Sequence, residues 1–217
     1  MARVFFEMAR SKSSAQWLRR HVADPYVRRA AAQGYRSRSA YKLLEIDRRE
    51  RILRAGARVV DLGAAPGGWS QVVAERVKPG GTVIAIDRLE IVPIAGVTAI
   101  AGDFREATAQ QALASALGGK KADVVLCDLS PDLTGIASID QARAEELALI
   151  AIEFCRAHLE PPGIFLLKVF QGESFREVLA RVKATFREVH TRKPAASRAE
   201  SRETYLLARG LTRGGGR

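Results

Sequence analysis

The chain has 217 residues, of which 47% are hydrophobic and 27% are charged. That length suits one domain with a sizeable core, and the composition excludes a chain that is disordered throughout. Its longest apolar runs are far shorter than the roughly 20 residues that span a bilayer, so we expect no membrane partner. Two cysteines, Cys127 and Cys155, and three scattered histidines form no zinc-ligand pattern. We therefore predict no disulfide, no metal site and a reducing, cytoplasmic location.

Positive charge is concentrated at the start of the chain. The whole sequence has 35 Lys and Arg against 24 Asp and Glu, a net charge of +11, and this excess indicates a polyanionic partner such as nucleic acid. Residues 1–38 alone hold nine basic and two acidic residues, interleaved with the aromatics Phe5, Phe6, Trp17, Tyr26 and Tyr35. We predict that this arm contacts RNA. The alternative is a solvated arm whose aromatic side chains pack on the core.

The next segment, 40–53, has the apolar spacing of an amphipathic helix, with Ser37 or Ser39 as its N-cap. Lys42 falls in the first turn of this helix. Because the helix dipole disfavours a cation there, we expect another group to hold Lys42 in place.

From residue 58 onward, short apolar runs alternate with helical patterns. Strands are predicted at 59–62, 82–87, 97–101, 123–128, 163–170, 186–191 and 203–208, and helices at 69–77, 106–117, 139–159 and 174–184. Such alternation predicts an α/β fold with a mostly parallel sheet in a single domain, 39–210. The glycine-rich end, 211–217, is expected to be a flexible tail.

A glycine-rich turn follows the first strand, where parallel sheets bind their ligands. It reads Asp61-Leu62-Gly63-Ala64-Ala65-Pro66-Gly67-Gly68-Trp69. The glycines do not have the G-x-G-x-x-G spacing, and Pro66 lacks an amide donor, so binding of a pyrophosphate is poorly supported. The turn instead suits a ligand that approaches the backbone closely without phosphates. An ordinary tight turn with capping acids is the alternative.

Carboxylates follow the other strands. Asp87 lies 24 residues beyond Gly63, near the offset at which an acidic side chain reaches a ribose diol, and Asp103 ends the next strand. Together with Asp61 and Asp128, these carboxylates would repel a pyrophosphate and favour a cation. We predict S-adenosylmethionine, a sulfonium cation, rather than NAD, so an NAD-dependent oxidoreductase is disfavoured.

Three segments resemble the FtsJ-like family of ribosomal RNA 2′-O-ribose methyltransferases, the RlmE type. They are Asp61–Gln71, Gly102-Asp103-Phe104-Arg105 and Lys168-Val169-Phe170-Gln171-Gly172, and the likeness spans roughly 37–210. The resemblance implies a Rossmann-like methyltransferase fold with a seven-stranded, mostly parallel sheet, one antiparallel strand and helices on both faces. It implies cofactor contacts at Gly67, Trp69, Asp87, Asp103 and Asp128, to which the loop itself adds Gly63. It also implies a catalytic tetrad of Lys42, Asp128, Lys168 and Glu203.

The implied reaction is 2′-O-methylation of a uridine in large-subunit ribosomal RNA, in the loop that binds aminoacyl-tRNA, within the large subunit. Other readings stay open: a noncatalytic RNA-binding or ribosome-assembly factor on the same fold, or a methyltransferase of transfer RNA or messenger RNA caps. One residue departs from the family pattern, because Asp132 stands in Ser130-Pro131-Asp132 where the family commonly has Asn. A carboxylate cannot donate a hydrogen bond as an amide does, so the RNA contacts of this loop are in question.

Lys168 is our candidate general base, since burial and the nearby Lys42 would both disfavour its charged form. The carboxylates of Asp128 and Glu203 would instead favour the charged form of Lys168. The sequence leaves both roles open for Lys168, a neutral base or a protonated electrostatic guide, with Lys42 positioning the hydroxyl and Glu203 in support.

Overall fold

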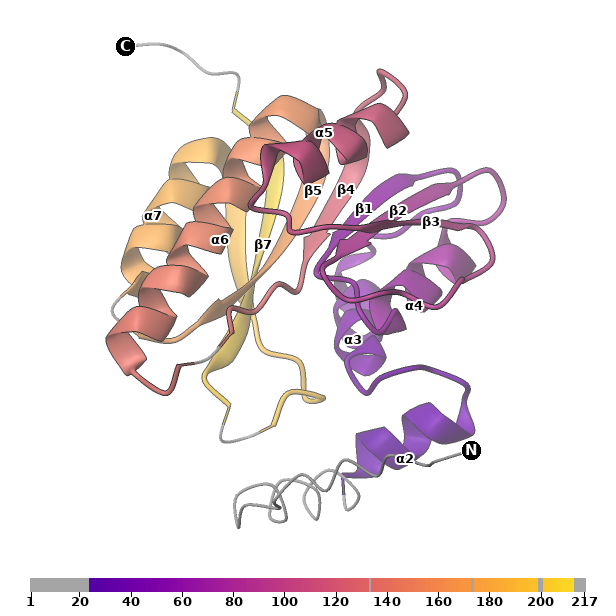
Figure 1. Ribbon diagram of the computed structural model, residues 1–217, viewed down its shortest axis with the longest axis horizontal. Helices are drawn as coiled ribbons and strands as arrows, with labels where there is room; N and C mark the ends of the chain where they lie inside the picture. The colour runs from indigo at the N-terminus through magenta and orange to yellow at the C-terminus, as the bar shows by residue number, and fades with distance from the viewer. Residues whose placement is uncertain (1–23, 133, 173, 199–200, 213–217) are drawn as a thin grey trace, which may run out of the picture.

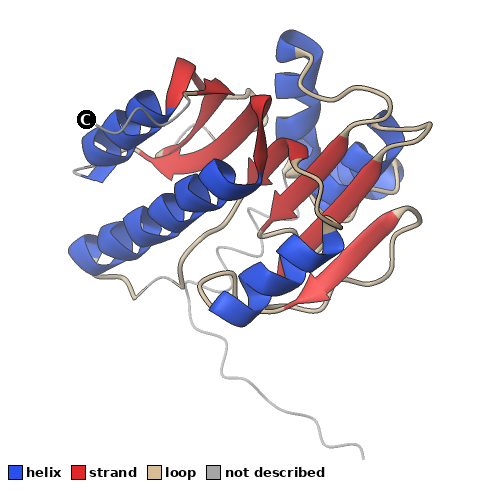
Figure 2. Cartoon of the chain, turned by 90° about the horizontal axis from the view of Figure 1, so that it is seen from above, coloured by secondary structure: helices blue, strands red, loops and turns tan. Residues whose placement is uncertain are grey.

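The computed structural model describes residues 24–132, 134–172, 174–198 and 201–212. One twisted sheet runs through the molecule, with helices on both of its faces (Figures 1 and 2). The strands are β1 (Arg58–Leu62), β2 (Thr82–Asp87), β3 (Val97–Ala101), β4 (Ala122–Cys127), β5 (Leu159–Phe170), β6 (Phe186–Arg192) and β7 (Glu203–Leu211). The helices are α2 (Pro25–Ala32), α3 (Ala40–Glu50), α4 (Gly68–Arg76), α5 (Ala107–Ala116), α6 (Ala137–His158) and α7 (Ser174–Thr185).

The strand order is β3-β2-β1-β4-β5-β7-β6, and β7 runs antiparallel to both of its neighbours. The other paired strands are parallel. The predicted seven-stranded fold with one antiparallel strand is therefore confirmed. The order reverses between β1 and β4, since β2 and β3 extend from one side of β1 and β5 follows β4 on the other. Such a switch point is where open α/β sheets bind their ligands.

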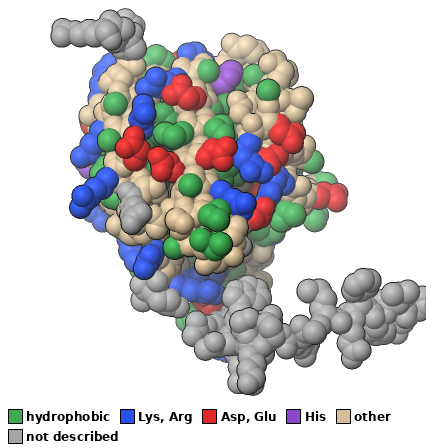
Figure 3. Space-filling view, turned by 60° about the vertical axis from the view of Figure 1, so that its left-hand side comes forward, with side chains coloured by type: hydrophobic (Ala, Val, Ile, Leu, Met, Phe, Trp, Pro, Cys, Tyr) green, Lys and Arg blue, Asp and Glu red, His purple; other side chains and the backbone are tan. Residues whose placement is uncertain are grey.

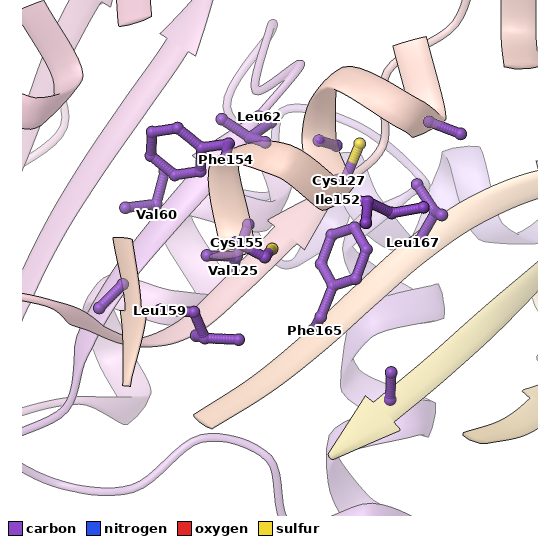
Figure 4. Packing of buried hydrophobic residues seen from close by; sticks show 14 of the residues in the cluster. Val60, Leu62, Val125, Cys127, Ile152, Phe154, Cys155, Leu159, Phe165 and Leu167 are labelled. Carbon is purple, nitrogen blue, oxygen red and sulfur yellow. The ribbon is translucent and has the colours of Figure 1, made fainter. Parts of the chain in front are cut away.

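Two hydrophobic clusters cover the two faces of the sheet, because alternate residues of each buried strand point to opposite sides. On one face, Ile152 and Cys155 of α6 pack against Val125 and Phe165 of the central strands (Figure 4). On the other, α3 and α4 contribute Leu43 and other apolar residues that pack on the opposite side of the same strands. The continuous apolar runs in the sequence thus reflect burial on both faces.

Several boundaries differ from the prediction. Helix α3 ends at Glu50 rather than residue 53, because Arg51 takes a left-handed conformation with φ 51° and ends the helix. Ser39 occupies the N-cap of α3, but its side chain makes no capping bond and lies 2.6 Å from Ser37 Oγ. Strand β5 begins at Leu159, four residues earlier than predicted.

The ends of the domain also need correction. Residues 25–32, assigned to the basic arm, form α2, whose N-cap Asp24 accepts a hydrogen bond from the amide of Tyr26. The tail was predicted from residue 211, but β7 includes Leu211, and the Thr212 amide donates to Thr185 O. The remainder of the predicted arm, 1–23, and of the tail, 213–217, lies outside the described residues.

No helix in the described part of the chain is long and apolar enough to cross a membrane. The face that Figure 3 shows carries basic and acidic side chains side by side. The net positive charge therefore does not appear as a uniform basic surface on that face.

Candidate active site

A cavity of about 600 Å³ opens at the switch point. Its walls come from the ends of β1, β2, β3 and β4 and from the first half of α6. Four of the predicted cofactor residues line it, namely Gly63, Asp87, Asp103 and Asp128. Residues that the sequence reading did not single out complete the wall, among them Arg88, Phe104, Arg105, Arg143 and Leu147.

Gly63 lies where the turn after β1 meets the segment after β4. Its φ is +79°, a conformation that side chains rarely adopt, and a Cβ would lie 2.8 Å from the amide nitrogen of Leu129. Glycine is therefore required for the two segments to approach each other at the floor of the cavity.

The two carboxylates expected to bind adenosine are fixed by different donors. Asp87 accepts from the backbone amides of Ala65 and Leu89, at 3.0 and 2.9 Å. Asp103 is held by Arg105, whose side-chain hydrogen bond is the main cause that lowers the pKa of Asp103 to about 2. Both side chains are thus held in a fixed orientation. The low pKa of Asp103 means that its carboxylate is ionised at neutral pH.

Gly67 and Trp69 are not among the residues that line this cavity. Gly67 is the N-cap of α4, with φ 109°, and a Cβ there would meet Ile94 and Arg36. Trp69 is 2% exposed; its indole nitrogen donates to Ser39 O at 2.8 Å, and its ring packs 5.8 Å from that of Tyr205. The cofactor contact implied for these two residues stays a prediction.

Asp61 is fully buried beneath the glycine turn. Ser70 donates to its Oδ2 at 2.7 Å, whereas Oδ1 is a buried atom without a hydrogen-bond partner. Burial is the largest cause that raises the pKa of Asp61 to about 7, and nearby Asp128 and Asp87 raise it further against the opposing hydrogen bond of Ser70. An uncompensated carboxylate in this position favours a cationic ligand nearby.

Lys168 and Asp128 form an ion pair at the ends of two adjacent parallel strands. Lys168 Nζ lies 3.2 Å from Asp128 Oδ1 and donates to the Asp128 backbone carbonyl at 2.6 Å; the side chains are 7% and 18% exposed. Tyr205 donates to Asp128 Oδ1 at 3.1 Å. Burial, followed by the charges of Asp128 and Glu203, raises the pKa of Tyr205 well above its usual value, so the hydroxyl keeps its proton.

The antiparallel pairing of β5 and β7 brings these groups together. Lys168 pairs with Tyr205, and Phe170 pairs with Glu203, two positions further along. Because residues two apart on a strand share a face, Glu203 and Tyr205 lie on the same side of the sheet as Lys168. This is the face that α3 covers, and α3 provides Lys42.

Lys42 and Glu203 form the second ion pair. Lys42 Nζ lies 2.5 Å from Glu203 Oε1, the side chains are 11% and 12% exposed, and Ser197 donates to the same oxygen at 2.8 Å. Burial alone would raise the pKa of Glu203, but the charge and hydrogen bond of Lys42, with the Ser197 hydroxyl, hold it below its usual value. Glu203 is thus the group that holds Lys42 in the first turn of its helix.

The structure therefore brings all four predicted tetrad residues into one linked cluster. It adds Tyr205 and Ser197, which the sequence reading missed. A tyrosine inside an apolar strand gives the pattern of a core residue, and only its placement opposite Lys168 identifies it. Ser197 lies in a loop that gives no pattern at all.

Basic residues of the predicted arm that are described make contacts within the protein. Arg36 donates to the carbonyls of Pro66 and Pro93, and Arg38 pairs with Asp24 at 3.1 Å. Tyr26 and Tyr35 pack against Tyr41, with ring centroids 5.6 and 5.8 Å away. For these two tyrosines, packing on the core is what the structure describes.

Comparisons with known proteins identify the family. A family model described as FtsJ-like methyltransferase matches residues 35–211. The chain belongs to the FtsJ-like methyltransferase family. Among its relatives, a protein of Nitrosospira multiformis is 53% identical over 94% of this chain and 98% of its own length. One of Chromohalobacter salexigens is 51% identical over 93% and 96%. Both are named Ribosomal RNA large subunit methyltransferase E.

Solved structures show the same fold. A protein of Plasmodium falciparum described as a ribosomal RNA methyltransferase has a TM-score of 0.74 at 30% identity, covering 82% of this chain and 98% of its own. Fibrillarin of Aeropyrum pernix, solved with natively bound S-adenosyl-L-methionine, has a TM-score of 0.54 at 16% identity, covering 80% and 75%. At 16% identity, the likeness to fibrillarin concerns the fold alone.

The residues of the FtsJ-like site fit S-adenosyl-L-methionine. The turn leaves no space for a side chain at Gly63, two oriented carboxylates face the cavity, and the unpartnered oxygen of Asp61 lies beneath the turn. Within the described residues, no group of three or more His, Cys, Asp or Glu side chains is placed to hold a metal ion.

Proposed function

We propose that this FtsJ-like protein uses S-adenosyl-L-methionine to methylate a ribose 2′-hydroxyl of large-subunit ribosomal RNA, the target being a uridine of the loop that binds aminoacyl-tRNA. The single observation that carries the proposal is the ion pair of Lys168 with Asp128 at the edge of a carboxylate-lined cavity. The names of relatives about 50% identical over nearly their whole length support the choice of ribosomal RNA.

In this proposal, Asp87 and Asp103 hold the adenosine, and Gly63 and Asp128 flank it in the cavity. Gly67 and Trp69 support the turn that carries the methionine end. When bound, S-adenosyl-L-methionine supplies a methyl group on a sulfonium, a good leaving group. Alignment of the hydroxyl with that methyl group contributes on the order of 7 to 11 kcal/mol.

For Lys168 to act as the base, its ammonium first releases a proton to solvent; the neutral Nζ then receives the proton of the 2′-hydroxyl as the oxygen becomes nucleophilic. Asp128 then stabilises the resulting ammonium through the contact of 3.2 Å with Oδ1. Tyr205 fixes Asp128 by donating to the same oxygen. Lys42, held by Glu203, donates to the ribose and positions it.

The wider partner is the large ribosomal subunit. The N-terminal region, residues 1–38, contacts its RNA through side chains other than the internally packed Tyr26 and Tyr35 and the internally bonded Arg36 and Arg38. A cytoplasmic location agrees with Cys127 and Cys155, which are both free and buried. The methyltransferase domain comprises the predicted residues 39–210, and β7 extends it to Leu211.

The test is transfer of tritiated methyl groups to protein-free ribosomal RNA, to large subunits and to intact ribosomes from cells that lack this protein. We expect one methylated uridine ribose, mapped by alkaline-resistant linkage, in at least one of these substrates. Lys168→Met is the negative control. Absence of incorporation into all three would contradict the proposal and favour a noncatalytic RNA-binding factor; incorporation only into transfer RNA would change the substrate.

A further inference from the structure

A second cavity of about 280 Å³ lies beside Lys168. It is bounded by the end of β5, the first half of α6 and the start of α7. Figure 1 shows these parts of the three elements at the lower edge of the sheet. Leu129, Ser130 and Pro131 line both this cavity and the larger one. The ion pair of Lys168 with Asp128 connects the two, because Lys168 lines the second cavity and Asp128 the first.

The walls of the second cavity are mainly apolar and include two aromatic rings. Phe170 and Phe175 lie on either side of the β5–α7 connection, and Ala144 and Pro131 contribute small apolar surfaces. Aromatic side chains are the usual platforms on which proteins stack unpaired RNA bases. The cavity is smaller than the roughly 300 to 1,000 Å³ of pockets for drug-sized ligands, so it suits one ring system rather than a whole nucleotide.

Polar groups are placed in the same wall. Gln141 and Arg202 line the cavity, and a Cβ at Gly172 would lie 2.8 Å from Gln141 Nε2, so the chain passes closely over that amide. An amide offers both a donor and an acceptor, as the hydrogen-bonding edge of a base requires. Arg202 provides a cation for stacking or for an adjacent phosphate.

Building on the proposed function, we propose that the second cavity receives the base of the nucleotide whose ribose is methylated. The 2′-hydroxyl and the base are attached to neighbouring carbons of the sugar. A hydroxyl placed at Lys168 and Asp128 therefore puts its own base within a few ångströms, beside the cavity that Lys168 lines. The target nucleotide leaves the stack, as it does for enzymes that act on a flipped base.

The first test combines a protein variant with an RNA variant. The RNA is the substrate mapped by methyl transfer, made with its target nucleotide either intact or lacking the base. Ala144→Phe fills the cavity, whereas Ala142→Phe places the same side chain at an exposed position of α6 that does not line it. The quantities measured are kcat/KM with each RNA and the Kd of S-adenosyl-L-methionine.

We expect the unaltered protein and Ala142→Phe to lose about tenfold or more in kcat/KM when the base is removed. Ala144→Phe is expected to lose a similar factor with the intact RNA and nothing further with the RNA that lacks the base. Its Kd for S-adenosyl-L-methionine should be unchanged, which shows that the domain is folded and the first cavity intact.

A second variant guards against misfolding by Ala144→Phe. Phe175→Leu keeps an apolar side chain but removes a stacking surface, so we expect a loss of a few-fold that disappears with the RNA lacking the base. If both variants distinguish the two RNAs as well as the unaltered protein does, this inference is wrong while ribose methylation stands. If no RNA is methylated at all, the proposed function itself has failed.

Discussion

The carboxylates of this site fall into two groups that are neutralised differently. On the proposed cofactor side, Asp61 and Asp87 are held by neutral donors, a serine hydroxyl and backbone amides, and Asp103, which pairs with Arg105, is the exception. On the proposed substrate side, Asp128 and Glu203 each form an ion pair with a lysine. These carboxylates lie at or near the same edge of one sheet, so the difference comes from their immediate partners rather than from the fold.

This difference divides the chemistry. Carboxylates without a basic partner keep a negative potential at the end of β1 and β2, which attracts a cation. Carboxylates paired with lysines form a balanced cluster that attracts no particular charge but can orient a neutral hydroxyl and exchange a proton with it.

Lys168→Met should have the largest effect. It removes the proposed proton acceptor and leaves Asp128 without its cation, so we expect kcat to fall by about 1,000-fold, within the range of general acid–base catalysis. Methyl transfer to the mapped RNA measures the loss. Lys183→Met, an exposed lysine of α7, is the matched control and should keep full activity.

Lys168→Met also tests whether cofactor binding and methyl transfer depend on different carboxylates. Lys168→Met should bind S-adenosyl-L-methionine with nearly unchanged affinity, measured by calorimetry, because the lysine does not line the first cavity. A loss of cofactor binding as large as the loss of rate would show that the two groups of carboxylates form one functional unit.

Asp61→Asn tests the carboxylates that have no basic partner, through the pH dependence of the stability of the fold. The pKa of Asp61 is raised from 3.8 to about 7, mainly by burial, so the folded protein keeps a proton that the unfolded chain releases above pH 4. The stability of the fold therefore decreases as pH rises from about 4 to 7, and the full cost is present above pH 7. A shift of this size corresponds to at most about 4 kcal/mol.

We expect Asp61→Asn to raise Tm by several degrees at pH 8 and by much less at pH 5, as measured by calorimetric unfolding without cofactor. It should also weaken binding of the cationic S-adenosyl-L-methionine at pH 8. Ser70→Ala is the control, because it keeps the carboxylate and removes its donor, and it should lower Tm at pH 8. An equal change for Asp61→Asn at both pH values would mean that Asp61 is ionised throughout.

The sequence predicted the sheet and its carboxylates for a physical reason. Strands buried on both faces are continuous apolar runs, so the acids directly after them, Asp87 and Asp103, are placed at the ligand edge by topology alone. Lys42 was notable for its place in the first turn of a helix, but only the family resemblance grouped it with Glu203. They come from a helix and a strand 161 positions apart in sequence, and their meeting depends on how α3 packs on the sheet.

Other features depended on packing that no local pattern records. Arg88 and Asp132 pair across 44 positions, and the second cavity is formed by three elements that are each ordinary in sequence. Helix α2 is different, because it did carry a signal. Asp24 followed by Pro25 is a typical helix start, but the basic charge of the segment favoured the interpretation as an arm.

Removing the second ion pair should have a smaller effect than removing the first. Lys42→Met and Glu203→Gln each leave one charge without its partner, and we expect about a tenfold loss in kcat/KM, or about 1.4 kcal/mol. The double variant should be no worse than the worse single variant, because the two residues act as a unit. Additive losses, measured with the mapped RNA, would show that each contacts the substrate independently.

The smallest effect is expected for the pair that spans the mouth of the first cavity. Arg88 donates to both oxygens of Asp132, at 2.9 and 2.7 Å, and so connects the end of β2 with the loop after β4. This pairing lowers the pKa of Asp132 and gives its carboxylate a basic partner. Because both side chains are exposed, the pair should contribute little to the stability of the fold.

Substitutions of the two partners should nevertheless change the Kd of S-adenosyl-L-methionine differently. Asp132→Asn removes the bridge and a negative charge, and both changes disfavour a cationic cofactor, so its Kd should rise by about twofold at low salt and not at 0.5 M salt. Arg88→Gln also removes the bridge but makes the mouth more negative, so the two changes oppose each other and Kd should stay nearly constant. If both variants weaken binding equally and independently of salt, the bridge acts by closing the cavity, and the potential of the unpaired carboxylates does not reach its mouth.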